Sequence, residues 1–562
     1  MNAMNQSIGK LSTFLLSLSL ALGATSAFAY TEQVTLKQGV IIGVTDSGSG
    51  TNRWLGIPYA QAPVGDLRWQ LPQPPKASDE PFQADQQGNL CPQVSSGEVI
   101  GNEDCLNLNI YRPNTQKKLP VVLYIHGGNN QGGRADEFDP SQLAVDINAV
   151  IVTLNYRLGA LGFNPMNVLK SDDAVQASGN FTLLDQARAL DWIRNHISQF
   201  GGQADNITVS GFSAGGRDVM AMLISPLFAG KFEHAIVFSG GMTTSPVEAS
   251  QIVFRRAFAR LVVEDGVQPD QQSAEAWLAQ PTPAVKKYLL TLPADRIARL
   301  MQNAGIRMSV FPHLYRDGTV LPQEGFATHR YNEVPTMMLT GHDEFSFFAL
   351  GDPYFSQKED WAADPKRVNE YRFVYRYGGM LYRSFNVAQS AQKMAAHFRA
   401  PIYAGEFDYG SDPTVVGSQM KDLGAFHGVF LPLLDDHFRK PYLGKAFDSP
   451  GAKALGLLFK RHLEAFIRTG HTSFSDTTRW NPWNLKREDK GQTVYMMDAN
   501  HNAAIAYRSE PTFTVKDVIA MIEDDHTVSQ ESKVYLLQHV LNGRWFSREL
   551  DDHFGSPNLW AQ

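Results

Sequence analysis

A serine between glycines is the first feature of this sequence that could do chemistry. Residues 208–223 read TVSGFSAGGRDVMAML, which places Ser213 in a G-x-S-x-G pattern between β-branched residues and a helix-forming segment. Two interpretations fit: a plain glycine-rich turn, or a sharp strand-to-helix elbow that presents the Ser213 hydroxyl as a nucleophile. Average Gly and Ser usage produces this pattern by chance in roughly one chain of this length in six, so other residues must decide.

A serine hydroxyl is a weak nucleophile, so it needs a base, usually His, and a carboxylate that orients the base. It also needs N–H donors for the oxyanion that develops during attack. The segment YIHGGNNQGG (124–133) follows an apolar run and contains Asn129, a residue type that tolerates unusual backbone angles. We expect the N–H groups of Gly128, Asn129 and Ala214 to form the oxyanion hole; the alternative is an ordinary glycine-rich loop.

The elements around these segments alternate between strand-like and helix-like patterns. Residues 119–128 and 149–159 are continuous apolar runs rich in Val and Ile, which predict strands covered on both faces. Residues 183–202 place apolar side chains at helical spacing and end at two glycines, and the strand-like NITVSG follows. This alternation predicts a mostly parallel sheet with helices on both faces, in which reacting groups lie at the carboxyl ends of the strands.

Composition and length favour a large globular enzyme. The 562 residues are 43% hydrophobic, and the net charge of -7 comes from interspersed charges, so we expect no nucleic-acid role. No protein partner is predicted. The main domain is expected over residues 30–510, with a helical insert at about 245–310, and residues 511–562 are expected to form a helical C-terminal appendage with a helix start at Thr514.

The N-terminus is typical of a secretory signal. Lys10 precedes the apolar run LSTFLLSLSLALGA, and Ala27-Phe28-Ala29 is a small-x-small cleavage signature. The alternative is a buried or membrane-anchoring helix. Because the run is short and rich in Ser, and no other stretch could span a bilayer, we expect no stable membrane insertion. We predict cleavage near Ala29 and a periplasmic or extracellular protein.

The chain contains two cysteines, Cys91 and Cys105. In an oxidising compartment a bridge between them would stabilise the fold by about 3 kcal/mol, while two buried free thiols are the alternative. The sequence lacks H-E-x-x-H and clustered His/Cys spacing, so we expect no metal site.

Several collinear segments together resemble one known family. Residues 30 to about 505 resemble the type-B carboxylesterases, α/β-hydrolases that include the cholinesterases, and we interpret the chain as a bacterial-type secreted member. The resemblance implies a large, mostly parallel central sheet flanked by helices, and the family's first disulfide corresponds to Cys91 with Cys105. The segments that carry it are GIPYAQAPVGDLRW, CPQ, EDCLNLNIYRP, NYRLGALGF, GNFTLLDQARALDWIRNHISQFGG and VSGFSAGG.

The same resemblance implies the remaining catalytic residues. TGHDEFSFFALG (340–351) is similar to the segment that carries the acid, which falls on Glu344, with Asp343 as the nearby competitor. GAFHGVFLPLL (424–434) is similar to the segment that carries the base, which falls on His427. The order Ser, acid, His is that of α/β-hydrolases. His126 is expected to shape the oxyanion loop and not to act as a second base.

The sequence also departs from the family pattern near the pocket. Phe212 stands where many relatives have an acidic residue before the nucleophile, and the loop between the cysteines contains no aromatic residue. Both differences argue against a quaternary ammonium substrate and favour a comparatively apolar pocket. Asn129-Asn130 replaces the usual Gly-aromatic pair, so we expect Phe212 and Asn130 to shape the substrate pocket.

The expected function is hydrolysis of neutral or apolar carboxylic esters through an acyl-enzyme, without a cofactor. The sequence leaves open aromatic or phenolic esters, carbamates and short lipids as substrates. A second class also remains, because some members of the family have lost the nucleophile and serve as binding proteins. Here all three catalytic residue types stand at their motif positions.

Overall fold

The computed structural model describes residues 29–302, 304–357, 361–418, 420, 422–472, 479–483, 493–510 and 513–556. The predicted secretory signal, residues 1–29, lies outside these described residues except for Ala29. Within the described part, no helix combines the length and the apolar character that crossing a bilayer requires.

A single large sheet forms the centre of the described structure. Its strands follow the order β1-β2-β3-β7-β9-β8-β10-β11-β12-β13-β14-β15, and β4 pairs with β2. The run from β9 to β14 is parallel, and antiparallel pairs lie at both sides. The strands are β1 (Ala29–Leu36), β2 (Gly39–Asp46), β3 (Thr51–Pro58), β4 (Phe82–Gln83), β7 (Asn107–Pro113), β8 (Leu119–Ile125), β9 (Val150–Leu154), β10 (Gly202–Phe212), β11 (His234–Phe238), β12 (Thr336–Gly341), β13 (Ile402–Phe407), β14 (Val494–Ala499) and β15 (Ala504–Ser509).

Strand β8 shows why its apolar run is continuous. Val121, Leu123 and Ile125 belong to one hydrophobic core, while Val122 and Tyr124 belong to the core on the opposite face. Successive side chains of a strand point to opposite faces, so a sheet that is covered on both sides needs apolar residues at every position. The predicted mostly parallel sheet with helices on both faces is confirmed.

Two sets of helices provide these covers. Helix α4 (Phe181–His196) and helix α5 (Ala214–Ile224) pack in the first core, and α17 (Pro450–Thr469) packs in the second. The shorter helices are α2 (Ser141–Asp146), α3 (Gly159–Gly162), α10 (Ser346–Gly351), α11 (Pro353–Ser356), α13 (Ser390–Ala395), α14 (Pro413–Val416), α15 (Leu431–Leu434) and α16 (Lys440–Leu443).

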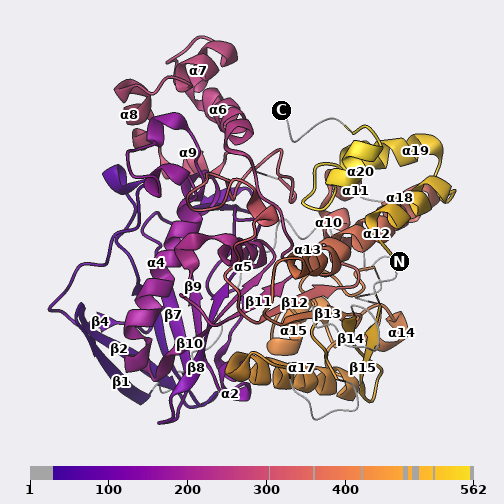
Figure 1. Cartoon of the computed structure of the whole chain (residues 1–562), viewed down its shortest axis with the longest axis horizontal. Helices are drawn as coiled ribbons and strands as arrows, with labels where there is room; N and C mark the ends of the chain where they lie inside the picture. Colours follow the sequence, from indigo (N-terminus) through magenta and orange to yellow (C-terminus); the bar gives the residue numbers. More distant parts are fainter. Residues whose placement is uncertain are drawn as a thin grey trace.

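Helices also form two outlying parts of the molecule. In the region of the expected insert lie α6 (Val247–Glu264), α7 (Gln271–Leu278), α8 (Pro283–Thr291) and α9 (Ala294–Ala298), which project from one end (Figure 1). Helix α18 (Val515–Asp524) begins after a capping box of Thr514 with Asp517. It packs against α12 (Pro365–Arg383) together with α19 (Gln530–Tyr535) and α20 (Arg548–His553), drawn in yellow in Figure 1.

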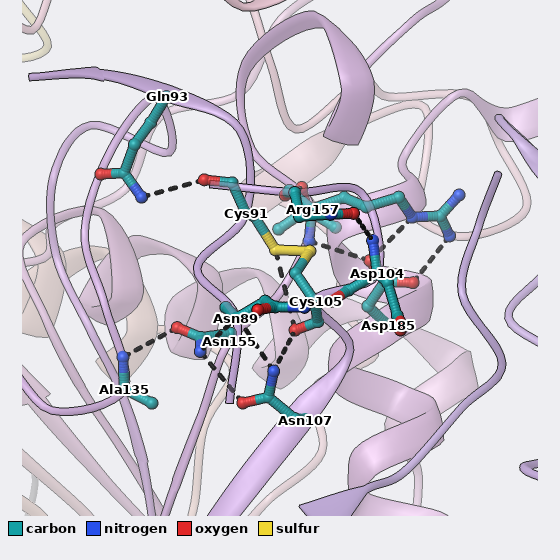
Figure 2. Close-up of a disulfide and its surroundings, with 12 residues drawn as sticks. Asn89, Cys91, Gln93, Asp104, Cys105, Asn107, Ala135, Asn155, Arg157 and Asp185 are labelled. Carbon is teal, nitrogen blue, oxygen red and sulfur yellow. Dashed lines mark hydrogen bonds and ion pairs between the residues drawn. A yellow bond between two sulfur atoms is a disulfide. The ribbon is translucent and has the colours of Figure 1, made fainter. Parts of the chain in front are cut away.

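The predicted disulfide between Cys91 and Cys105 is present, with 5.1 Å between the two Cα atoms. It closes a loop that contains a small hairpin, β5 (Gln93–Ser95) and β6 (Glu98–Ile100). Figure 2 shows the bridge buried among polar side chains, including Asn107 and Asn155. Asn155 donates to Asn107 Oδ1 (3.1 Å) and accepts from the backbone N–H of Ala135 (2.9 Å). The bridge therefore lies in a network that reaches the segment after β8.

Candidate active site

Ser213 lies on a strained turn between β10 and α5. Its φ of 56° and ψ of -117° are unfavourable for a residue with a side chain. The turn requires glycine on both sides of Ser213, because a side chain there would clash with the backbone. A Cβ on Gly211 would lie 2.2 Å from the Gly215 carbonyl oxygen, and one on Gly215 would lie 2.2 Å from the Ile125 carbonyl oxygen. Of the two interpretations of the glycines, the structure has the strand-to-helix elbow.

Strand register brings the other loops to this elbow. Gly211 pairs with Ile125, and Phe212 pairs with Phe238, so the carboxyl ends of β8, β10 and β11 are level. Phe238 in turn pairs with Leu339 of β12. The residues that follow these four strands therefore meet at one edge of the sheet, as expected for an α/β fold.

His427 and Glu344 form a hydrogen-bonded pair at this edge. The Nδ1 atom of His427 bonds Oε2 of Glu344, whose side chain is fully buried. Burial alone would raise the pKa of Glu344, but the imidazole and the hydrogen bonds outweigh burial and hold the pKa below its usual value. Glu344 is therefore an anion that orients the ring and can stabilise a positive charge on it.

The second Glu344 oxygen is held by three donors. Oε1 accepts from Ser239 Oγ (2.5 Å), Thr340 Oγ1 (3.0 Å) and the backbone N–H of Gly341 (2.7 Å). Ser239 follows β11 and has a positive φ of 52°. Ser239 was not among the residues expected from the sequence; the only available signal was its position in FSGG directly after a strand.

Asp343, the competing acid, faces a different loop. Its Oδ2 atom accepts from the backbone N–H of Ala425 (2.9 Å) and from Ser411 Oγ (3.0 Å). Asp343 therefore anchors the chain just before His427, and of the two carboxylates only Glu344 contacts the imidazole.

Three aromatic rings surround the imidazole of His427. The ring centroids of Phe212, Phe348 and Tyr382 lie 4.8, 5.0 and 5.5 Å from that of His427, and the Tyr382 ring is nearly parallel to it, at 20°. The Nε2 atom of His427 is buried and has no hydrogen-bond partner among the described residues. No direct hydrogen bond joins it to Ser213, but both residues line one cavity of about 380 Å³.

The expected oxyanion donors lie at this cavity. Gly128 (φ 97°) and Asn129 (φ 58°) have left-handed backbones and line the cavity. A Cβ on the preceding Gly127 would lie 3.1 Å from Ser213 Cβ, so this loop is in direct contact with Ser213. Within the described structure, no acceptor takes the N–H groups of Gly128 and Asn129, and Ala214 begins α5, where N–H groups lack intrahelical acceptors.

Asn130 and His126 lie behind the cavity and not in its wall. The Asn130 side chain is fully buried and donates to Asp218 Oδ1 at 2.9 Å; of the two expected pocket residues, only Phe212 lines the cavity. His126 stacks on Tyr156 with 4.3 Å between centroids, and burial lowers its pKa to about 4. A neutral, enclosed His126 supports the oxyanion loop and does not face Ser213.

The wall of the cavity also contains two charged residues that the sequence patterns did not predict. Glu137 accepts a 2.6 Å hydrogen bond from Tyr124, and burial raises its pKa to about 7. The Arg439 guanidinium lies 5.2 Å from the Phe438 ring centroid and 5.6 Å from that of Phe347. The pocket thus combines five phenylalanine rings with one carboxyl and one guanidinium group.

Gln93 connects the disulfide loop to the oxyanion loop. Its amide donates to the carbonyl oxygen of Gly133 (2.9 Å) and accepts from the N–H of the same residue (2.8 Å). A further bond runs from Gln93 Nε2 to the carbonyl oxygen of Cys91 (3.1 Å). The loop that carries Gly128 and Asn129 is thus fixed at its far end by a residue two positions from a bridged cysteine.

A serine on a strand-to-helix elbow, with a histidine and a carboxylate from later loops of a mostly parallel sheet, defines the α/β-hydrolase class. Residues 30–380 match the profile of the carboxylesterase family, and the chain belongs to this family.

Individual relatives agree with this assignment. Human cocaine esterase is 31% identical over 494 residues, which cover 79% of this chain and 83% of that protein. Para-nitrobenzyl esterase of Bacillus subtilis is 41% identical over 225 residues, 38% of this chain and only 45% of that protein. Among solved structures, carboxylesterase EST55 of Geobacillus stearothermophilus superposes with a TM-score of 0.66 at 25% identity, over 85% of this chain and 98% of that one.

Proposed function

We propose that this protein is a serine hydrolase that cleaves carboxylic esters through an acyl-enzyme intermediate. One observation carries the proposal: the His427–Glu344 pair presents a buried Nε2 atom, unpartnered among the described residues, in the cavity that Ser213 also lines. The similarity to proteins named para-nitrobenzyl esterase and cocaine esterase supports the same activity.

The proposed reaction has two halves. Ser213 Oγ attacks the ester carbonyl while His427 Nε2 accepts its proton, and Glu344 stabilises the imidazolium. The N–H groups of Gly128, Asn129 and Ala214 bind the oxyanion. The intermediate collapses as His427 returns the proton to the leaving alcohol, and water then attacks the acyl-enzyme by the same route. These steps need no cofactor.

The cavity supports small neutral or apolar esters as substrates. Its volume of about 380 Å³ and its phenylalanine-rich wall suit a ligand that buries apolar surface. Aromatic or phenolic esters, carbamates and short lipids remain alternatives, and a panel that varies acyl length and alcohol bulk would separate them by kcat/KM.

Replacement of Ser213 tests the activity. Ser213→Ala is expected to lower kcat for p-nitrophenyl butyrate by a factor on the order of 10⁴ while the fold is retained. Ser225→Ala is the matched control, because Ser225 ends the same helix with a buried hydroxyl that has no partner among the described residues. Hydrolysis by the Ser213 variant at the parental rate would refute the proposal.

We also propose export to the periplasm or the cell exterior, with cleavage near Ala29. The disulfide supports this proposal, because such bridges persist in oxidising compartments. N-terminal sequencing of the mature protein should begin near Tyr30; a product that retains Met1 and stays in the cytoplasm would contradict it.

A further inference from the structure

A second cavity, of about 490 Å³, lies apart from the catalytic one and shares none of its lining residues. Its walls come from the segment after β11, from α13 and from the C-terminal chain that enters α20. Rings form part of the surface: Phe326, Phe385, Trp545 and Phe546. The space is therefore built by segments that are distant in sequence and offers both apolar and polar contacts.

Three cationic side chains converge on this cavity. Arg316, Lys393 and Arg548 all line it, and none of the three side chains forms an ion pair or hydrogen bond with another described residue. Burial and the charge of Arg548 lower the pKa of Arg316 by more than the carboxylate of Glu248 raises it. Burial and the charge of Arg316 lower the pKa of Lys393. The cations thus repel one another within one space.

The carboxylates nearby do not neutralise this cluster. Glu324 and Glu549 also line the cavity, but neither lies within ion-pair distance of the three cations. Two enclosed arginines elsewhere in the molecule do have a carboxylate partner: Arg157 pairs with Asp185 at 2.6 Å, and Arg544 pairs with Asp352 at 2.7 Å. Arg316 is half-buried, while Lys393 and Arg548 are exposed, so these three unpaired cations can contact an anion that enters the cavity.

We propose that this cavity binds an organic anion, specifically a carboxylate on an apolar body. The guanidinium of Arg316 and the ammonium of Lys393 hold the carboxylate, since charge-assisted hydrogen bonds to carboxylates are the strong ones. The rings of Phe385 and Trp545 contact the apolar body. Arg548 adds positive charge at the rim, where its side chain is exposed.

A ring separates this site from the catalytic one. Phe546 packs on Tyr382 with 5.0 Å between centroids, and the Tyr382 centroid lies 5.5 Å from that of His427. Because neither Ser213 nor His427 lines this cavity, a ligand in it does not touch these proposed catalytic groups. The proposal is therefore tested by measuring how tightly the carboxylate binds, and not by measuring ester turnover. It does not depend on the assignment of the protein as an ester hydrolase.

Calorimetric titration of the full chain with 4-phenylbutyrate tests the site. The parental protein is expected to bind the carboxylate at least tenfold more tightly than the neutral 4-phenylbutyramide and than inorganic phosphate. Arg316→Met and Lys393→Met are each expected to weaken carboxylate binding at least tenfold, because each removes a charge-assisted bond.

Two control variants locate the binding. Lys287→Met removes an exposed cation on α8, and Arg439→Met removes the cation of the catalytic cavity; neither should change the affinity. Loss of binding in Arg439→Met with no loss in the Lys393 variant would place the ligand in the catalytic cavity and overturn the proposal. Equal affinity for the amide, equal or tighter binding of phosphate, or no binding at millimolar ligand would overturn it as well.

Discussion

The imidazole of His427 is positioned by rings as much as by its carboxylate. The face of Tyr382 lies nearly parallel to the imidazole, and the Tyr382 hydroxyl, although buried, has no hydrogen-bond partner among the described residues. An aromatic face attracts a cation, so this ring would favour the imidazolium that the proposed attack forms. The phenol oxygen itself contributes nothing to that attraction.

This arrangement predicts different effects for two substitutions of Tyr382. Tyr382→Phe keeps the ring and should retain kcat within about twofold, whereas Tyr382→Leu removes the ring and should lower kcat about tenfold with little change in KM. Steady-state kinetics with one chromogenic ester, with circular dichroism as the folding control, measures both. Equal kcat in the two variants would show that the ring does not act on His427.

Ser239 acts on the same pair from the opposite side. Its hydroxyl is one of the groups that hold the pKa of Glu344 low. In Ser239→Ala that pKa rises, so Glu344 becomes protonated at a higher pH and the imidazole loses its anion.

The expected result is an activity loss that grows toward acid. The kcat/KM of Ser239→Ala should be within about threefold of the parental value at pH 8 and about tenfold lower at pH 5. Ser225→Ala serves again as the control, and a pH profile with the parental shape would remove Ser239 from the mechanism.

At the scale of elements, helix α5 carries two fully buried ionisable residues, Arg217 and Asp218, in the turns that follow Ser213. Asp218 is fully buried, and its carboxylate accepts from Asn130 Nδ2 and from Gln186 Nε2 (2.7 Å). Burial nevertheless raises its pKa to about 7. Arg217, also fully buried, donates to the Thr243 carbonyl oxygen and lies over the Trp545 ring.

Asp218 should make the stability of the fold depend on pH. An unfolded Asp ionises near pH 4, so the native chain holds an extra proton between about pH 4 and pH 7, and the stability contribution of this group falls as pH rises through that window. Asp218→Asn lacks this effect. The free energy of unfolding of the variant, minus that of the parent, should therefore be more favourable at pH 8 than at pH 4 by roughly 2–4 kcal/mol.

Denaturant unfolding at both pH values measures this difference. The Asn amide can be accommodated if Gln186 rotates, because Gln186 Oε1 is buried without a partner among the described residues. Asp79→Asn, an exposed carboxylate, is the control. A constant difference between Asp218→Asn and the parent across pH would show that Asp218 does not titrate in this window.

The elements also differ in how far the sequence predicted them. The sequence predicted the strands over 119–128 and 149–159, because a strand buried on both faces is a continuous apolar run. It also predicted the helix over 183–200, because a helix buried on one face has apolar residues at helical spacing. The pairing of β1 to β3 at the edge was not predicted, although these strands are neighbours in sequence, because β2 is only partly buried and its apolar pattern is weak.

The site shows the same division. The glycines around Ser213 indicate an elbow from their spacing alone, because each is required by a backbone contact. Other features depend on side-chain directions, which the spacing of residues does not encode. These are the choice of Glu344 over Asp343 and the roles of Ser239 and Glu137.

At the scale of the whole molecule, the described C-terminal helices share a hydrophobic core with segments close to His427. Trp545 and Leu537 pack in one core with Tyr382 and Phe345, which lie next to the catalytic loops. The described C-terminal segments therefore pack behind Tyr382, the ring next to His427, and they form part of the wall of the second cavity.

The disulfide loop is the second long-range connection, and Gln93→Ala tests it. Loss of its paired bonds to Gly133 frees the loop that carries Gly128 and Asn129, so kcat should fall about tenfold while the melting temperature changes little. Gln73→Ala, at an exposed position, is the control. Parental kcat in the Gln93 variant would separate the disulfide loop from the chemistry.

Gln93 bonds both to Cys91 and to Gly133, so it links the disulfide to the loop that carries the amides beside Ser213. The oxidation state of the two cysteines should therefore affect the position of these amides. A newly synthesised chain in a reducing cytosol would lack the bridge, so the amides beside Ser213 would be loosely positioned. Such a chain would hydrolyse esters slowly until the cysteines were oxidised. Reduction of this buried bridge by a strong dithiol should therefore lower kcat, and reoxidation should restore it.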